Sequence, residues 1–151
     1  MVKVHTIEML EHSAKNFPNV AAHKDFINGS LVGLGDGVTT APVSGKPVYV
    51  VINQQVGDDE YKEDYKILKG QTVNLFDLTS WADKELDITE TNVALGDGEK
   101  FADLVKGTEL TFDAATLKFK KGTSAAGDVG FVVESKWGQI TNGVTVKIVI
   151  K

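Results

Sequence analysis

The sequence predicts an all-β fold, which is an antiparallel β-sandwich or β-barrel of about eight short strands with a short N-terminal helix or arm. Many stretches alternate between apolar and polar residues, as in Glu85–Asn92, and this two-residue period is typical of strands with one buried face. Turn signals rich in glycine separate these stretches at spacings of about 8–12 residues. No helical pattern lies between them as a crossover, which favours antiparallel pairing.

Residues 1–19 are predicted to form an arm or short helix outside a single β domain at residues 20–151. Apolar residues recur there at helical spacing as far as Pro18, which predicts a helix at about Thr6–Lys15. The alternative is a strand at Val2–His5 that continues as a loose arm. In either case the segment is too small to have a core of its own.

The β domain is expected to begin with a hairpin, a loop and a buried strand. Asn28-Gly29 lies between Phe26-Ile27 and Leu31-Val32, and this pair is typical of a hairpin because both residues tolerate positive φ. Gly35–Pro47 is rich in turn-forming residues and is expected to be a long loop. Val48–Ile52 is an unbroken apolar run, which predicts a strand covered on both faces.

The middle of the chain contains three strand-like stretches separated by two turns. Tyr61–Leu68 alternates cleanly, Thr72–Leu78 follows a Lys-Gly turn, and Glu85–Asn92 follows a turn at Thr79–Lys84. Trp81 lies in that second turn with polar residues on both sides. It is therefore the aromatic residue that we expect at the surface.

A hairpin and two long strands are predicted to complete the domain. Thr108–Lys120 has the pattern of a hairpin, with its turn at Asp113-Ala114-Ala115. The strand that ends at Ile150 predicts a C-terminus paired within a sheet. In the strand before it, alternation is expected to place four apolar residues on one face, namely Val129, Phe131, Val133 and Trp137.

Composition excludes several classes of function. The chain has no cysteine, so disulfides, thiolate catalysis and cysteine-based zinc sites are excluded. Its net charge is −5 and it has no basic cluster, which argues against nucleic-acid binding and against anionic membrane surfaces. No apolar run approaches the roughly 20 residues needed to cross a bilayer.

The possible metal and phosphate sites have simpler explanations. His5, Glu8 and His12 would share one helical face, but a short terminal helix lacks the rigidity and supporting shell of a zinc site. The acidic run Asp58–Glu60 lacks the ligand spacing of a calcium loop. The glycines at 33, 35 and 37 are not followed by a helix, so they are expected to be turn glycines. We therefore predict neither metal nor cofactor.

Trp81 provides the remaining candidate for chemistry, as a platform that stacks a sugar or as part of a protein interface. No nucleophile elbow or paired-carboxylate motif is present, so we predict that the protein is not an enzyme. The enzymatic alternative is a carboxylate pair assembled by the fold from loop residues such as Asp36, Asp58 or Asp97.

Three segments together resemble the small virion structural proteins of tailed bacteriophages, of the head decoration or cement type. They are NGSLVGLGDG at residues 28–37, the stretch from KPVYVVINQQVGDDEYK to LDITETNV at residues 46–93, and GTELTFDAATLKFKKG at residues 107–122. The resemblance lies in the order of strands and turns and carries no catalytic motif.

The resemblance implies a non-enzymatic role on the virion, where the protein binds the outer capsid lattice of the major capsid protein and stabilises the head. It also implies a homo-oligomer, for example a trimer at lattice three-fold points, that is made in the bacterial host cytoplasm. A tail or connector component and a stand-alone carbohydrate-binding β-sandwich are the alternatives. The residues proposed for partner contact are Ile7, Met9, Leu10, Phe17 and Trp81.

Overall fold

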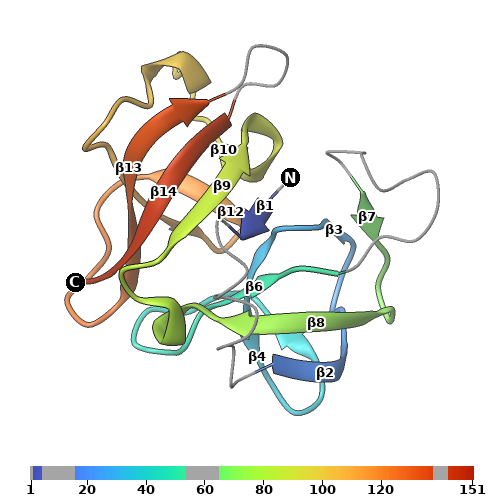
Figure 1. Cartoon of the computed structure of the whole chain (residues 1–151). Coiled ribbons are helices and arrows are strands. Elements are labelled where there is room, and N and C mark those ends of the chain that lie inside the picture. Colours follow the sequence, from blue (N-terminus) through green and yellow to red (C-terminus); the bar gives the residue numbers. More distant parts are fainter. Residues whose placement is uncertain (1, 5–15, 54–64, 138–142) are drawn as a thin grey trace.

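The computed structural model describes residues 2–4, 16–53, 65–137 and 143–151, and over these ranges the chain forms strands and three short 3-10 helices. A seven-stranded sheet, a five-stranded sheet and a two-stranded pair make up the molecule (Figure 1). This confirms the predicted all-β class. The number of strands exceeds the expected eight, because several of the fourteen described strands have only two or three residues.

The seven-stranded sheet lies at the upper left of Figure 1. In spatial order its strands are β1 (Val2–Val4), β9 (Glu85–Thr89), β14 (Gly143–Ile150), β13 (Val129–Trp137), β11 (Glu109–Asp113), β12 (Lys118–Lys121) and β10 (Val93–Ala94). All described pairs in this sheet are antiparallel except β10 with β12, which run parallel. The expectation of purely antiparallel pairing is therefore wrong at this edge.

The five-stranded sheet lies below it in Figure 1, with the two-stranded pair at its right. Its strands in spatial order are β2 (Asn16–Ala21), β8 (Thr72–Asp77), β6 (Tyr49–Val51), β4 (Leu31–Leu34) and β5 (Thr39–Thr40). The pair consists of β3 (Phe26–Ile27) and β7 (Lys66–Ile67), and the 3-10 helices are η1 (Leu78–Trp81), η2 (Glu90–Asn92) and η3 (Phe101–Asp103).

Both described ends of the predicted arm are strands. β1 pairs with β9, so the strand that the alternative predicts at Val2–His5 is present over Val2–Val4. β2 runs across the predicted boundary after residue 19 and pairs with β8. Pro18 lies where the register of β2 shifts, and an irregular edge strand tolerates a residue that cannot donate to the ladder. The expected helix at Thr6–Lys15 falls outside the described residues.

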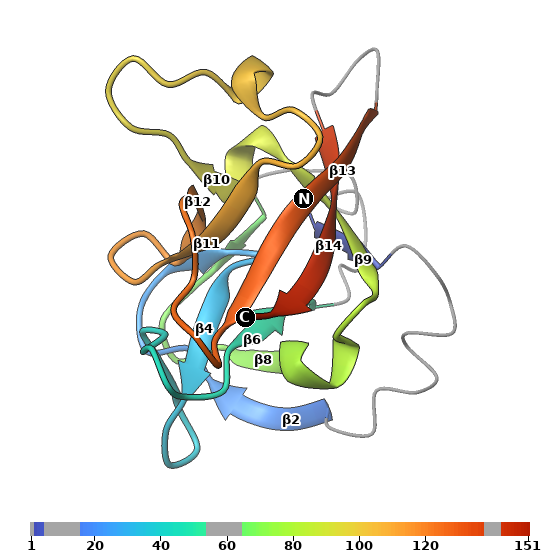
Figure 2. The same ribbon diagram turned by 90° about the vertical axis from the view of Figure 1, so that its left-hand side faces the viewer.

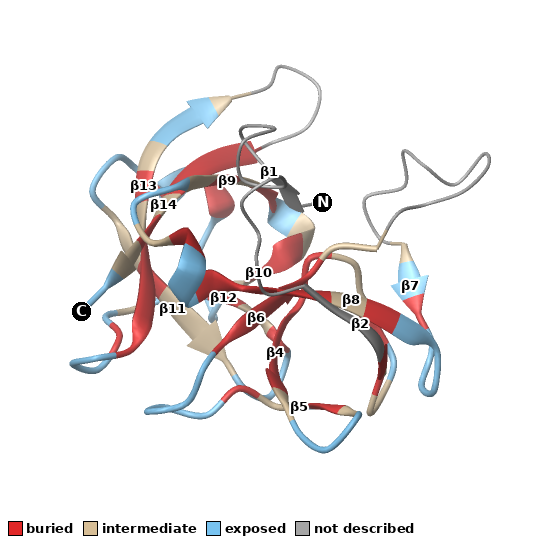
Figure 3. Cartoon of the chain, turned by 60° about the horizontal axis from the view of Figure 1, so that its bottom comes forward, coloured by how far each residue is buried: buried red, intermediate tan, exposed pale blue. Residues whose placement is uncertain are grey.

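The five-stranded sheet has an apolar cluster on each face. In β6 and the residue before it, Val48 and Val50 belong to the cluster shared with the seven-stranded sheet, whereas Tyr49 and Val51 belong to the cluster on the opposite face. All four residues are buried, which confirms the prediction from the unbroken apolar run. Figure 3 shows β4 and β6 almost wholly in the buried colour.

The Asn28-Gly29 turn forms, but the predicted hairpin does not. Gly29 has a φ of 86°, as the turn requires. The flanking strands pair elsewhere, because Phe26 lies opposite Ile67 in the two-stranded pair and Leu31 lies opposite Val50 in the five-stranded sheet. The turn therefore passes the chain between two sheets, and tertiary pairing overrides the local signal.

The two strands at the end of the chain, β13 and β14, form as expected, except that Trp137 lies on the other face of β13. β14 lies between β9 and β13, so the C-terminal strand is paired on both sides. The register shifts between Val133 and Ser135, so Trp137 lies opposite Gly143 instead of continuing the inward row. A bulge of one residue reverses the alternation. The prediction that Trp137 shares a face with Val133 is therefore wrong.

The predicted hairpin of β11 and β12 is confirmed, and its turn connects the two sheets. Phe112 lies opposite Phe119 in the hairpin. Leu117, in the turn, is fully buried in the apolar cluster on the face of the five-stranded sheet opposite the seven-stranded sheet, here called the outer cluster. Its carbonyl accepts a hydrogen bond from Leu31 N at 2.8 Å. Figure 2 shows β11 and β12 above β4. Leu117 has a φ of 61°, which is unusual for a leucine.

We expect Leu117→Ala to lower the free energy of unfolding by about 2–5 kcal/mol, because it empties a fully buried leucine site. Leu117→Gly should cost no more than Leu117→Ala, because glycine relieves the positive φ and so offsets its usual disadvantage. Urea unfolding measures both values. Val105→Ala, at a side chain that is 56% exposed, is the control and should change stability by less than about 0.5 kcal/mol.

Candidate functional site

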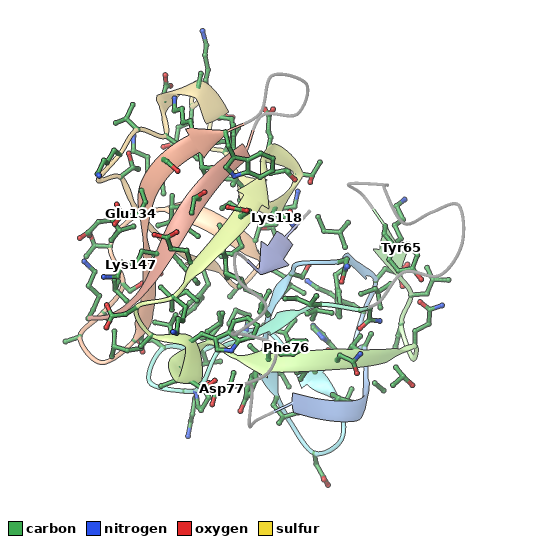
Figure 4. All side chains as sticks on the ribbon, in the orientation of Figure 1. Tyr65, Phe76, Asp77, Lys118, Glu134 and Lys147 are labelled. Atoms are coloured by element: carbon green, nitrogen blue, oxygen red, sulfur yellow. The ribbon has the colours of Figure 1, made fainter. Side chains whose placement is uncertain are left out.

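Trp81 is a core residue, so the expectation that it lies at the surface is wrong. Only 2% of it is exposed, and its ring stacks on Phe76 with the ring centroids 5.2 Å apart. Figure 4 places Phe76 and Asp77 at the end of β8 that approaches the seven-stranded sheet. Trp81 Nε1 is buried and has no hydrogen-bond partner in the described part of the chain.

The 3-10 helix η1 explains why Trp81 is buried although its neighbours in the sequence are polar. Side chains three residues apart lie above one another in such a helix, so Leu78 and Trp81 both point into the core. Thr79 and Ser80 lie between them and are exposed. Asp77 caps the helix, and its Oδ1 accepts a hydrogen bond from Thr79 N at 2.8 Å. A glycan platform built on Trp81 is therefore excluded.

Trp81→Ala should lower the free energy of unfolding by about 3–5 kcal/mol, as for other large buried aromatic residues. Trp81→Phe should cost less, because it keeps the stacking on Phe76 and removes the unpaired indole N–H. Chemical unfolding of the two variants beside Leu68→Ala, at a 50% exposed position, measures this. A loss below about 0.5 kcal/mol for Trp81→Ala would contradict the buried placement.

The other residues predicted to contact a partner are only partly placed. Ile7, Met9 and Leu10 fall outside the described residues, as do the His5, Glu8 and His12 set and the acidic run Asp58–Glu60. Phe17 lies in β2, opposite Leu75 of β8. The structure therefore does not bring these residues together with Trp81 into one described surface.

Gly35 and Gly37 lie in the β4–β5 connection, which confirms them as turn glycines, whereas Gly33 lies within β4 opposite Thr40, so the turn prediction is wrong there. Gly35 N donates to Val38 O at 2.8 Å, and Gly37 has a φ of 70°. A Cβ at Gly33 would lie 2.6 Å from Thr40 Oγ1, so a side chain has no room there. Gly33 thus permits the close approach of β5 to β4, and no phosphate site is needed to explain it.

Large apolar side chains are exposed at four separate places in the described chain: Val43, Leu68, Val105 and Ile150. Isolated exposure of this kind is ordinary in proteins. Val43 borders a hollow. That hollow has a volume of about 380 Å³ and is lined by residues of β4 and β5, by the loop at residues 41–47 and by Tyr49.

A second hollow of about 420 Å³ lies on the other side of the same loop. Lys46 and Pro47 line both hollows, and Lys46 is the only charged residue in either lining. The first hollow also includes Leu34 and Tyr49, and the second includes Thr79. Both volumes are at the low end for ligand sites in proteins, so the hollows suit individual side chains of a partner better than a whole cofactor.

The buried Asp128 accepts a hydrogen bond from the loop at residues 41–47. Gly45 N donates to Asp128 Oδ1 at 2.7 Å, and Lys151 N donates to Asp128 O at 3.0 Å. The loop and the C-terminal residue thus share one anchor. The sequence predicts only a loop at Gly35–Pro47, because the hollows form from segments that are distant in sequence.

A row of asparagines joins the two sheets and accounts for several buried polar groups. Asn92 Nδ2 donates to Asn28 O at 3.1 Å, and Asn28 Oδ1 accepts from Asn53 N at 2.9 Å. Asn53 in turn binds β8 through Asn74 N at 2.8 Å and Thr72 O at 3.0 Å. These bonds satisfy backbone groups at the junction, so their role is structural.

The perturbed titratable groups also have structural partners. Hydrogen bonds from the Lys151 ammonium and the Thr123 hydroxyl lower the pKa of Glu109. The Thr116 hydroxyl lowers the pKa of Asp113 in the hairpin turn. Asp83, whose carboxylate lies 2.9 Å from the ammonium, raises the pKa of Lys147. Each shift favours the charged form, unlike the raised pKa that a carboxylic acid catalyst requires.

Tyr49 has the opposite kind of shift. Its burial, and then the nearby Asp77 carboxylate, raise the pKa of the phenol, so Tyr49 stays neutral beside the first hollow.

Figure 4 shows Tyr65 near β7, at the far side of the five-stranded sheet from Asp77, while Lys147 and Glu134 lie on the seven-stranded sheet.

The described ranges contain no group of three or more His, Asp or Glu side chains arranged to hold a metal ion. Among these residues, none of the helices has the length and apolar character required to cross a membrane. Comparison with known proteins shows that no family model matches this sequence and that no curated protein matches it.

Proposed function

We propose that this protein is a non-enzymatic structural component of a bacteriophage virion, which binds the outer lattice of the major capsid protein and stabilises the head. The observation that carries the proposal is the spatial contiguity of the three segments that resemble head decoration proteins. They contribute β4 from residues 28–37, β6 to β9 from residues 46–93, and the β11–β12 hairpin from residues 107–122.

These segments contact one another directly. Leu31 of the first segment lies opposite Val50 of the second, and Val50 lies opposite Phe76 of the same segment. The third segment joins them where Leu31 N donates to Leu117 O at 2.8 Å. Because the segments that carry the resemblance pack into one folded unit, they support a common architecture more strongly than segments scattered over the surface would.

The body has the properties that a capsid-binding protein needs. Its two apolar clusters lie on opposite faces of one sheet, and the C-terminal Lys151 is bonded to the turn at Asp128. These contacts hold the sheets and the C-terminal strand together, which suits a body that is exposed on a particle surface. In the proposal, affinity for the capsid comes from a separate segment of the chain and not from a deep binding site.

That segment is the stretch between β1 and β2, which contains Ile7, Met9 and Leu10. The two strands that flank this stretch in the sequence belong to different sheets. Contact of these residues with the capsid or with a neighbouring copy would add buried apolar area to a small interface. The proposed oligomer and its position on the lattice follow from the same resemblance.

Co-sedimentation with phage heads that lack this protein tests the proposal. The wild-type protein should saturate the heads at a fixed stoichiometry. The triple variant Ile7→Asp/Met9→Asp/Leu10→Asp should bind at least about tenfold more weakly, because carboxylates replace apolar contacts. Substitution is preferable to deletion of residues 1–19, because deletion would remove β1 and most of β2, which pair with β9 and β8.

Val105→Asp is the matched control, since this 56% exposed residue lies outside the segment. The control should bind heads as the wild type does, and circular dichroism should show that all variants are folded. Absence of binding by the wild type would refute the proposed function. Wild-type binding with an unaffected triple variant would instead place the contact elsewhere on the body.

A further inference from the structure

The five-stranded sheet nearly closes on itself, because its two edge strands meet. β2 and β5 are at opposite ends of the strand order, yet Ala21 forms a parallel bridge with Val38. Ala21 N donates to Gly37 O at 3.0 Å at the same place. We call this meeting of Ala21 with residues 37–39 the seam. One bridge is a weak closure compared with a full strand ladder, so nearby side chains matter for its stability.

His23 supplies the side-chain contact at the seam. Thr39 Oγ1 lies 3.0 Å from His23 N and 2.7 Å from His23 Nδ1, and Thr39 is fully buried. The backbone N–H must donate to the hydroxyl oxygen. We assign the hydroxyl proton to the contact with Nδ1, so that the imidazole is neutral and carries its own proton on Nε2. One threonine thus satisfies two groups of the loop that follows β2.

The surroundings of His23 favour this neutral form. Burial, and then the neighbouring Lys24, lower the pKa of the imidazole. Lys24 Nζ is held by Ala115 O at 3.0 Å, and Asp25 Oδ1 accepts from Lys69 N at 2.8 Å, so each neighbouring charge has a partner of its own. Asp36 lies exposed on the β4–β5 connection, and Phe26 packs beside the imidazole with ring centroids 6.1 Å apart.

We propose that protonation of His23 opens the seam between β2 and β5, so that the five-stranded sheet has a built-in acid-sensitive closure. A protonated Nδ1 is a donor and can no longer accept the Thr39 proton. The Thr39 hydroxyl must then turn its proton away from Nδ1, and Thr39 has no exposure to solvent. A buried donor without a partner is costly, so the open form is favoured.

The direction of the pH dependence follows from linkage. The pKa of His23 is lowered when the seam is closed, so the open form binds the proton more readily. The closed seam is therefore fully stable above the ordinary histidine value of about 6.5 and loses stability as the pH falls below it. Opening would free an edge of β5, which pairs on its other side with β4.

Amide hydrogen exchange at Ala21 reports directly on the seam, because its N–H donates across it. After correction for the intrinsic exchange rate, the opening constant at Ala21 should rise as the pH falls from roughly 7.5 to 5. Exchange at Ile148, whose N–H donates to Lys84 O at 2.9 Å in the seven-stranded sheet, is the internal control and should not follow this change.

Three variants separate this mechanism from general acid weakening. His23→Gln keeps a hydrogen-bonding side chain but cannot titrate, so the pH dependence at Ala21 should disappear while His5 and His12 remain. Thr39→Ser retains the hydroxyl and should retain the dependence. Thr39→Val removes the hydroxyl, and the opening constant at Ala21 should then be raised and independent of pH.

A wild-type opening constant at Ala21 that is flat through the His23 titration, followed by NMR, would overturn the proposal. So would an unchanged pH dependence in His23→Gln. Since the two conservative variants His23→Gln and Thr39→Ser keep the side-chain volume similar, the result does not depend on whether Thr39→Val folds. The test uses the isolated full chain, and its outcome is independent of any binding to phage heads.

Discussion

The burial of the five-stranded sheet on both faces is the constraint on which the rest of the structure depends. Strands β4, β6 and β8 contribute residues to two separate apolar clusters, one on each face. A sheet with two buried faces needs cover on both sides. The seven-stranded sheet covers one side, and the β3–β7 pair together with Leu117 covers the other.

This constraint explains the features that connect distant parts of the chain. The β11–β12 hairpin extends from one sheet to place Leu117 in the outer cluster of the other, even though leucine must then adopt a positive φ. The Asn28-Gly29 turn passes between sheets, and asparagine side chains satisfy the backbone groups left there. Hydrogen bonds at such a junction cannot come from one regular ladder, so side chains provide them.

In the proposed function, partner contact comes from the segment that lies between β1 and β2 in the sequence, and the hollows beside Lys46 can receive side chains of a partner. The seam differs, because it belongs to the fold itself and its stability depends on one titratable side chain. The proposed virion role and the proposed acid-sensitive closure are therefore independent of one another, and each has its own experiment.

Alternation and apolar runs were sufficient to predict the fold class, because they report which faces of a strand are buried. For the same reason they predicted the two-sided burial at Val48–Ile52 and the β11–β12 hairpin. The direction of Trp81, the pairing of the strands beside Asn28-Gly29 and the contact of His23 with Thr39 depend instead on the packing of the sheets. The i, i+3 geometry of a 3-10 helix is not visible in a strand-like pattern. Contacts between residues distant in sequence likewise depend on how the sheets pack, which local periodicity does not encode.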